Sequence, residues 1–310
     1  MTTIVITEFM EETAVERLKS RHETVYDPAL VDKKEELLRQ LGDCRALVVR
    51  NRTQVRGTLL EAASRLEVVG RLGVGLDNID VDACKARGIE VCPASGANDL
   101  SVVEYVITSA LMLLRGAYTS RQAMLDGGWP RNALMGRELA GRTMGLVGLG
   151  SIARGVAARA TALGMGVIAH DPFVSVHDPA WEGIGHRSLD EVFEQADIVS
   201  LHVPLTAGTR HLADARRLAL MREGSVLVNA ARGGVVDEAA LAEALRGGRP
   251  FGAALDVFET EPLTREAAAV FAGVDNLILT PHIAGVTEES NVRVSSVTAD
   301  NVLRVLSQAR

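Results

Sequence analysis

The sequence is poor in cysteine, in long apolar runs and in positive charge. Three cysteines among 310 residues cannot all pair with one another and show no metal-ligand spacing, which favours a reducing compartment and predicts no metal site. No apolar run approaches the roughly 18 residues of a membrane span, and the N-terminal MTTIVITEFMEE lacks the basic region and apolar core of a signal peptide. The net charge of −7 argues against a nucleic-acid partner, although a local arginine cluster could still bind small anions. We therefore expect a cytoplasmic protein with neither nucleic-acid nor membrane partners.

The sequence does contain a regular alternation of short β-branched runs and helical stretches, which predicts parallel sheets covered on both faces. Its length predicts about two domains. A first α/β unit of about five strands is expected from the runs Thr2–Thr7, Thr24–Tyr26, Ala46–Arg50, Val68–Leu72 and Ile89–Cys92, with helices near 11–21, 32–41, 55–65 and 80–87.

A long helix and an irregular segment separate this series from a second one. Apolar residues from Val102 to Leu114 form one helical stripe, and Ser101 with Glu104 has the S-x-x-E pattern of a capping box at its start. The segment 116–141 is interpreted as an excursion between domains or toward a partner subunit. In the second series we expect strands at 143–148, 166–170, 198–203, 225–230, 252–257 and 277–280, helices near 152–163, 188–195, 214–221 and 237–247, and a last helix after residue 286.

A glycine-rich turn opens the second series. Gly148-Leu-Gly150-Ser-Ile-Ala153 follows a predicted strand and begins a predicted helix. In a dinucleotide fingerprint the first glycine permits the turn, the second admits the pyrophosphate, and a small third residue lets helix and strand pack closely. The amides of Ser151 and Ile152 are then expected to hold the pyrophosphate at the positive end of the helix.

Asp171 ends the next predicted strand, twenty-one residues after Gly150. An acidic residue at this distance accepts hydrogen bonds from the ribose hydroxyls and repels a 2′-phosphate, which predicts NAD rather than NADP. The alternative is a glycine-lined turn in a fold that binds no nucleotide.

Three residues with acid/base or anion-binding chemistry follow predicted strands. Arg232 comes after SVLVNA, Glu261 after AALDV and His282 after LILT. Open α/β sheets place their ligands at the carboxyl ends of strands. Arg232 can grip a carboxylate, His282 can exchange a proton near neutral pH, and Glu261 can orient that histidine. Each residue alone could be structural or solvated, so it is their shared placement that predicts a catalytic site.

These residues lie in strings that resemble the D-isomer-specific 2-hydroxyacid dehydrogenase family. The strings are VGRLGVGLDNIDVDACKARGIEV (69–91), GLVGLGSIA (145–153), LHVPLTAGTRHL (201–212), NAARGGVVDEAAL (229–241), ALDVFETEP (254–262) and TPHIAG (280–285). The resemblance implies a Rossmann doubly wound parallel sheet inserted into a smaller flavodoxin-like α/β substrate domain. It implies a discontinuous substrate domain of residues 1–99 plus 285–310, an NAD-binding domain of residues 100–284, and a homodimer formed through the cofactor domain.

The resemblance also assigns roles to residues. Arg232, Glu261 and His282 match the catalytic trio, and Arg232 and His282 also bind substrate. The substrate carboxylate is expected at Val74-Gly75, and Arg50 matches the arginine of phosphoglycerate-type members. Arg52 stands where those members often have a small residue. It is either a further candidate for substrate binding or only a surface charge. The implied cofactor contacts are Gly148, Gly150, Ser151, Ile152, Asp171, His202, Pro204, Thr209, Ala230, Asp256 and Gly285.

We expect an NAD-dependent oxidoreductase that interconverts a small D-2-hydroxy acid and its 2-oxo acid by hydride transfer. The two arginines suggest a dianionic substrate such as 3-phosphoglycerate or 3-sulfolactate, while glyoxylate, hydroxypyruvate and lactate stay open. The resemblance is to phosphoglycerate-type members without a C-terminal regulatory domain, so we expect no serine feedback. Alternatives on the same fold are an NADH-sensing, corepressor-like protein and a formate-oxidising relative, although the latter has Gln where this chain has Glu261.

Overall fold

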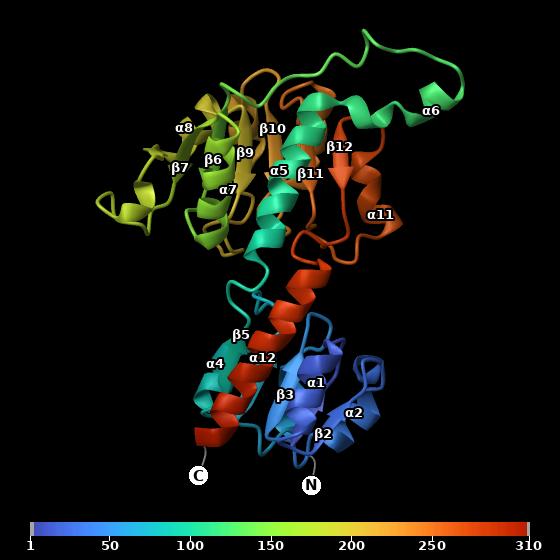
Figure 1. The fold of residues 1–310 in the computed structure, drawn as a ribbon, viewed down its shortest axis with the longest axis vertical. Helices are drawn as coiled ribbons and strands as arrows, with labels where there is room; N and C mark the ends of the chain where they lie inside the picture. The colour runs from blue at the N-terminus through green and yellow to red at the C-terminus, as the bar shows by residue number, and fades with distance from the viewer. Residues whose placement is uncertain (1–2, 309–310) are drawn as a thin grey trace. The chain divides into compact units, whose positions relative to one another are not determined.

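The computed structural model describes residues 3–308 and divides the chain into two compact units, each with its own sheet (Figure 1). Unit 1 consists of Met1–Asn98 together with Val286–Arg310, and unit 2 consists of Asp99–Gly285. In the sequence, unit 2 is therefore inserted into unit 1.

Unit 1 is built on a five-stranded sheet in which all strands run parallel. The strand order β2-β1-β3-β4-β5 is the flavodoxin-like order that the family resemblance implies. Thr2, the predicted start of the first strand, lies outside the described residues. The strands are β1 (Ile4–Ile6), β2 (Thr24–Tyr26), β3 (Ala46–Val49), β4 (Val68–Arg71) and β5 (Glu90–Pro93).

Helices cover both faces of this sheet. Successive side chains of a strand point to opposite faces, and because those of β1 and β3 are all apolar, both faces must be shielded from water. Ile4 and Ile6 pack with α1 and α12, whereas Val5 packs with the helices of the other face. All three cysteines are free, buried thiols. The helices of unit 1 are α1 (Glu12–Lys19), the 3₁₀-helix η1 (Leu30–Asp32), α2 (Lys34–Gln40), α3 (Gly57–Ala62), α4 (Val81–Ala86) and α12 (Glu288–Gln308).

Unit 2 contains a seven-stranded, fully parallel sheet of order β12-β11-β10-β9-β6-β7-β8. The order reverses direction between β6 and β9, the two strands that flank the topological switch point of a Rossmann sheet. The strands are β6 (Thr143–Val147), β7 (Gly166–His170), β8 (Gly185–His186), β9 (Ile198–Leu201), β10 (Val226–Asn229), β11 (Gly252–Leu255) and β12 (Leu277–Leu279).

Two apolar layers close this sheet. One contains α5 and α7 against side chains such as Leu146 and Val228, and the other contains α8, α9 and α10 against Val147 and Leu227. The helices are α5 (Asp99–Arg115), η2 (Ala117–Thr119), α6 (Arg121–Leu125), α7 (Ser151–Ala162), η3 (Pro179–Trp181), α8 (Leu189–Gln195), α9 (Ala215–Leu220), α10 (Glu238–Arg246), α11 (Arg265–Ala268) and η4 (Ala269–Phe271).

The structure corrects two details of the sequence analysis. The predicted capping box at Ser101 is wrong, because α5 begins at Asp99 and Ser101 lies inside its first turn. Sequence reasoning also missed β8, whose two residues (Gly185–His186) are too few to show a strand period. None of the helices within residues 3–308 is both long and apolar enough to cross a membrane.

Candidate active site

Three neighbouring strands of unit 2 carry the predicted catalytic residues. β10, β11 and β12 lie side by side, and Arg232, Glu261 and His282 belong to the segments that follow them (Figure 1). Because the carboxyl ends of parallel strands meet at one edge of a sheet, the fold brings these three segments to the same edge.

Glu261 and His282 form a hydrogen-bonded pair. Oε2 of Glu261 lies 2.7 Å from Nδ1 of His282, and its Oε1 accepts the N–H of Phe258 at 3.0 Å. Burial opposes ionisation, but the hydrogen bonds from His282 and Phe258, with the charges of His282 and Arg232, lower the pKa of Glu261 below its ordinary value. An ionised carboxylate only accepts hydrogen bonds, so Nδ1 carries the proton and Nε2 is left to exchange one with a substrate.

The segment that carries His282 is held by Asp256, a buried residue directly after β11. The carboxylate of Asp256 accepts the N–H groups of Ile283 and Ala284 at 2.8 Å each, and its backbone oxygen accepts that of His282 at 2.8 Å. His282 has φ 55°, a left-handed conformation that costs a non-glycine residue about 1–2 kcal/mol. The hydrogen bonds around His282 keep it in this conformation. Asp256, predicted as a cofactor contact, is thus also a clamp on this segment.

Two hydroxyl groups extend the clamp. Thr280 donates to Oδ1 of Asp256 at 2.6 Å, and the hydroxyl of Tyr105, on α5, lies 2.6 Å from that of Thr280. Because Thr280 uses its proton on the carboxylate, Tyr105 is the donor to Thr280. Burial raises the pKa of Tyr105 and keeps it protonated for this role. Sequence reasoning missed both residues, although Thr280 begins the string TPHIAG.

Arg232 lies on a turn that is organised by Asn229, the last residue of β10. Oδ1 of Asn229 accepts the N–H of Ala231 at 3.1 Å, and its Nδ2 donates to the backbone oxygen of Arg232 at 3.0 Å. A Cβ atom on Gly233 would lie 1.7 Å from the backbone oxygen of Phe258, so only glycine allows this turn to approach the segment of Glu261 so closely. The positive charge of Arg232 is among the influences that lower the pKa of Glu261.

The glycine turn between β6 and α7 fits a dinucleotide. Gly148 has φ 94°, and a Cβ there would lie 2.6 Å from the backbone oxygen of His202. A Cβ on Gly150 would meet no atom within 4 Å, which leaves open space in front of the helix. Gly150 is the N-cap of the twelve-residue α7 and gives it no side-chain hydrogen bond. The N–H groups of Ser151 and Ile152 in the first turn therefore suit a pyrophosphate.

Two other predicted cofactor contacts already have partners in the structure. Asp171 follows β7, and its carboxylate accepts the N–H of Leu149 in the glycine turn at 2.8 Å, an arrangement that places the acid beside that turn. The hydroxyl of Thr209 donates to the backbone oxygen of Pro204 at 2.6 Å and accepts the N–H of Thr206 at 2.8 Å. Thr209 thus closes the 204–209 loop on itself.

His202, directly after β9, presents a buried nitrogen. Its Nε2 has no hydrogen-bond partner among residues 3–308, and burial lowers the pKa of the imidazole to about 4. The backbone oxygen of His202 lies beside Gly148, and a buried ring nitrogen that lacks a protein partner is suited to a polar group of a bound dinucleotide. Ala230 follows β10 and packs against the apolar layer of α5 and α7, and Gly285 is the last residue of unit 2.

The two arginines predicted for substrate binding differ in their partners. Arg52 is exposed and forms a two-pronged ion pair with Asp32. Arg50 is half-buried: one guanidinium nitrogen donates to Oδ1 of Asn291 at 2.9 Å, and the group lies 6.0 Å from the ring centre of Phe9. Within residues 3–308 no carboxylate forms an ion pair with Arg50, so its charge is the better placed of the two for an external anion.

Val74 and Gly75 follow β4 in unit 1. Among the described residues, neither N–H has a hydrogen-bond partner, and the side chain of Val74 is exposed. Adjacent free amides on a loop suit a carboxylate. The structure thus divides the predicted site residues: the catalytic trio and the cofactor contacts belong to unit 2, and Arg50, Arg52, Val74 and Gly75 belong to unit 1.

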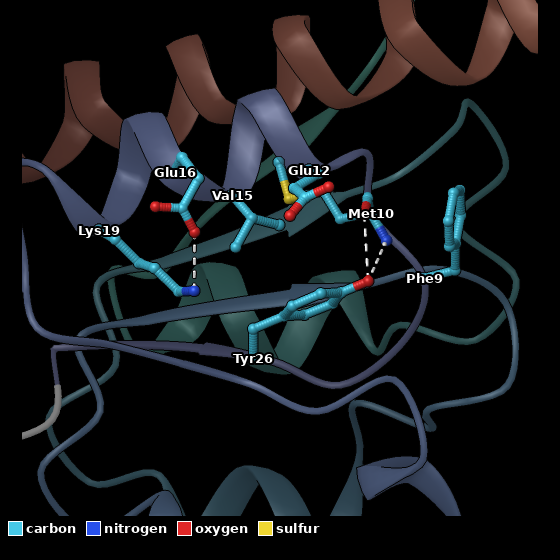
Figure 2. Close-up of a pocket in the computed structure, with 7 residues that line it drawn as sticks. All are labelled: Phe9, Met10, Glu12, Val15, Glu16, Lys19 and Tyr26. Carbon is cyan, nitrogen blue, oxygen red and sulfur yellow. Dashed lines mark hydrogen bonds and ion pairs between the residues drawn. The ribbon is translucent and has the colours of Figure 1, made fainter.

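A surface pocket between α1 and β2 belongs wholly to unit 1 (Figure 2). Its polar side chains are largely satisfied, since Lys19 pairs with Glu16 at 2.8 Å and the hydroxyl of Tyr26 bonds to the backbone of Met10. In the part of the chain that the structure describes, no group of His, Cys, Asp and Glu residues could hold a metal ion.

The doubly wound sheet, the glycine turn and the acid/base pair define a dinucleotide-dependent oxidoreductase. The chain belongs to the D-isomer-specific 2-hydroxyacid dehydrogenases: residues 107–284 match the family described as "D-isomer specific 2-hydroxyacid dehydrogenase, NAD binding domain". This confirms the family, the cofactor NAD and the NAD-dependent oxidoreduction of 2-hydroxy acids that the sequence analysis predicts.

Known relatives resemble the chain over most of its length. An (S)-sulfolactate dehydrogenase from Chromohalobacter salexigens is 55% identical over 307 residues, which is 99% of both chains. A hydroxypyruvate reductase from Thermotoga maritima is 40% identical over 274 residues, 88% of this chain and 89% of that one. The crystal structure of D-lactate dehydrogenase from Aquifex aeolicus, complexed with NAD and lactic acid, superposes with a TM-score of 0.86 at 28% identity, covering 99% and 96% of the two chains.

Proposed function

We propose that the protein is an NAD-dependent dehydrogenase of 3-sulfolactate, with Arg232, Glu261 and His282 as its catalytic residues. The observation that carries this proposal is the 2.7 Å hydrogen bond between Glu261 and His282 at the strand edge that also carries Arg232. Unit 2 is the cofactor domain in this proposal, and unit 1 is the substrate-binding domain.

In the oxidising direction, Nε2 of His282 accepts the proton of the C2 hydroxyl, and Glu261 stabilises the imidazolium that forms. Arg232 holds the substrate carboxylate and stabilises the charge that develops on the C2 oxygen. Bound NAD supplies the hydride acceptor. In the reducing direction, His282 returns its proton to the oxygen of the 2-oxo acid.

The sulfonate specificity rests on the 55% identity to (S)-sulfolactate dehydrogenase and on Arg50. The guanidinium of Arg50 donates to the amide oxygen of Asn291 and forms no ion pair with a carboxylate among residues 3–308. Its charge is therefore available to bind the sulfonate on C3 of the substrate. The (S) descriptor agrees with a D-specific family, because the sulfur-bearing carbon outranks the carboxyl group in sulfolactate. A D-configured sulfolactate is therefore labelled S, whereas D-lactate is labelled R.

A panel of substrates tests this function. NADH formation would be followed with (S)-sulfolactate, 3-phosphoglycerate and D-lactate, and NADH consumption with hydroxypyruvate and glyoxylate. We expect the highest kcat/KM with sulfolactate. A preference for hydroxypyruvate, the substrate named for the relative from Thermotoga maritima, would replace sulfolactate in the proposal. Tight NADH binding without turnover of any acid would favour an NADH-sensing protein instead.

The segment 116–141 supports a homodimer formed through unit 2. It extends away from the sheet of unit 2 in Figure 1, and Leu125, Trp129 and Met135 are 66%, 77% and 82% exposed. Exposed apolar side chains of this size on one segment mark an interaction site. Sedimentation should give the mass of a dimer, and Trp129→Ser together with Met135→Ser should shift it toward the monomer. The buried free thiols agree with a cytoplasmic location.

A further inference from the structure

Glu8 is a buried acidic residue of unit 1 that lies outside the sites assigned above. It follows β1 after Thr7, and only 5% of its surface is exposed. Burial of a carboxylate is costly unless hydrogen bonds compensate for the lost water. The partners of Glu8 therefore indicate what the side chain does.

Four consecutive backbone N–H groups surround this carboxylate. Oε1 accepts those of Arg50 and Thr53 at 2.9 and 3.0 Å, and Oε2 accepts those of Asn51 and Arg52 at 3.3 and 3.1 Å. These residues form the loop that follows β3, the strand beside β1 in the sheet. Glu8 thus binds the first four peptide N–H groups of this loop, residues 50–53, which belong to no helix or strand.

The electrostatics agree with a permanently charged clamp. Burial would raise the pKa of Glu8, but the hydrogen bonds from Thr53, Arg50 and Arg52 outweigh it and lower the pKa. Two further contacts fix the end of the loop: the hydroxyls of Thr7 and Thr53 lie 2.7 Å apart, and Asn78 donates to the backbone oxygen of Thr53 at 2.7 Å.

The same loop presents Arg50. Its backbone is held by Glu8, and its guanidinium is held by Asn291 and lies over Phe9. The guanidinium has five N–H donors, of which Asn291 takes one, so most of its capacity for an anion stays available. The arginine side chain is long and flexible, so its backbone must be fixed if the guanidinium is to bind a sulfonate in one defined position.

We propose that Glu8 is a positioning residue for substrate recognition: by accepting four amides of the loop 50–53, it places Arg50 to bind the second anion of the substrate. This rests on the proposed function. Glu8 itself does not touch substrate in this proposal and acts through Arg50.

The substitution Glu8→Gln tests the proposal with little change of shape. One carboxylate oxygen becomes an NH₂ group that faces two N–H donors, so half of the clamp turns from attractive to repulsive. We expect KM for (S)-sulfolactate to rise by about tenfold, with kcat changed by less than about threefold and KM for D-lactate nearly unchanged. Glu90→Gln is the matched control, because Glu90 also belongs to unit 1 but forms an exposed ion pair with Arg304.

A double-mutant cycle separates positioning from a general loss of stability. If Glu8 acts through Arg50, adding Glu8→Gln to Arg50→Ala should raise KM for sulfolactate little further, since the two changes remove the same interaction. Additive effects would overturn the proposal. If Glu8→Gln does not fold, Glu8→Asp, which keeps the charge but shortens the reach, takes its place in the cycle, with thermal melting and the Kd for NAD as checks.

The outcomes also separate this proposal from the proposed function. A wild-type protein that turns over sulfolactate, with an unchanged KM in Glu8→Gln, would contradict the role of Glu8 alone. A wild-type protein that turns over none of the acids would contradict the proposed function, and with it the recognition role given to Glu8.

Discussion

Two loops of the molecule, one in each unit, are fixed by the same physical device. In unit 1, Glu8 follows β1 and accepts amides of the loop after the neighbouring β3. In unit 2, Asp256 follows β11 and accepts amides of the segment after the neighbouring β12. Because parallel strands bring their carboxyl ends together, an acid at the end of one strand can hold the loop after the next.

The two loops differ in what the carboxylate holds. Glu8 binds the four successive amides of residues 50–53. Asp256 binds two amides and the hydroxyl of Thr280, and its backbone binds the N–H of His282, the one residue of this segment with a positive φ. The comparison teaches that the first clamp fixes the backbone of Arg50, the residue proposed to bind substrate, whereas the second holds His282, the residue proposed to exchange the proton, in a left-handed backbone conformation.

The largest effect in this comparison should come from the pair that the second clamp presents. In the proposed mechanism the carboxylate of Glu261 orients His282 through their hydrogen bond, so Glu261→Gln should lower kcat by about 10²-fold. The Kd for NAD should stay within about twofold, and titration calorimetry on the same sample provides this control. An unchanged kcat would show that Glu261 is structural.

Asp256→Asn tests the clamp itself. Its NH₂ group would face an N–H donor of the His282 segment, and a buried unmatched donor costs about 1–3 kcal/mol. We expect a lower melting temperature and a fall in kcat of about tenfold, both larger than those for the surface change Asp275→Asn. If stability falls and kcat does not, the clamp serves the fold and not the reaction.

The burial of the His202 imidazole should make the free energy of unfolding depend on pH. Its folded pKa of about 4 lies below the ordinary 6.5, so the unfolded chain takes up a proton first as the pH falls. The contribution of neutral His202 to the free energy of unfolding is fully present above pH 6.5. It is lost progressively as the pH falls toward 4, and the loss is at most about 3 kcal/mol. Denaturant unfolding at several pH values should show this slope in the wild type and a weaker slope in His202→Asn. Equal slopes would contradict the burial effect.

Arg52→Ala should have the smallest effect. It removes an ion pair with Asp32 that is exposed to solvent, and solvent screening leaves such pairs with little effect on stability. We expect KM for sulfolactate to change by less than about twofold, against about tenfold for Arg50→Ala. Steady-state kinetics of both variants with sulfolactate and lactate would check this. Equal losses of sulfolactate preference in the two variants would support Arg52 as a substrate residue.

The sequence allowed much of the fold to be predicted because strand period and glycine placement are local signals. The alternating strands of both parallel sheets and the turn at Gly148 can be predicted in this way, and the Rossmann-type topology follows from the family resemblance. The two residues of β8 carry no period. The start of α5 was misjudged because an S-x-x-E pattern is as compatible with a first turn as with a cap.

The clamps could not be predicted, since they join residues far apart in the chain. Glu8 and Arg50 are separated by 42 positions, and Tyr105 and Thr280 by 175. An acid after a buried strand gives no sign of which loop it will hold until strand order is known. The ion-pair partner of Arg52 could not be predicted either. The direction of a side chain beyond the end of a strand depends on its neighbours in space, here Asp32.

The most direct test of the account is the turnover of His282→Gln with (S)-sulfolactate and NAD, measured beside the wild type. The account predicts a kcat lower by about 10²–10⁴-fold with an almost unchanged Kd for NAD, because the substitution removes the proton acceptor and leaves the glycine turn intact. A variant that oxidises sulfolactate at nearly the wild-type rate would contradict it.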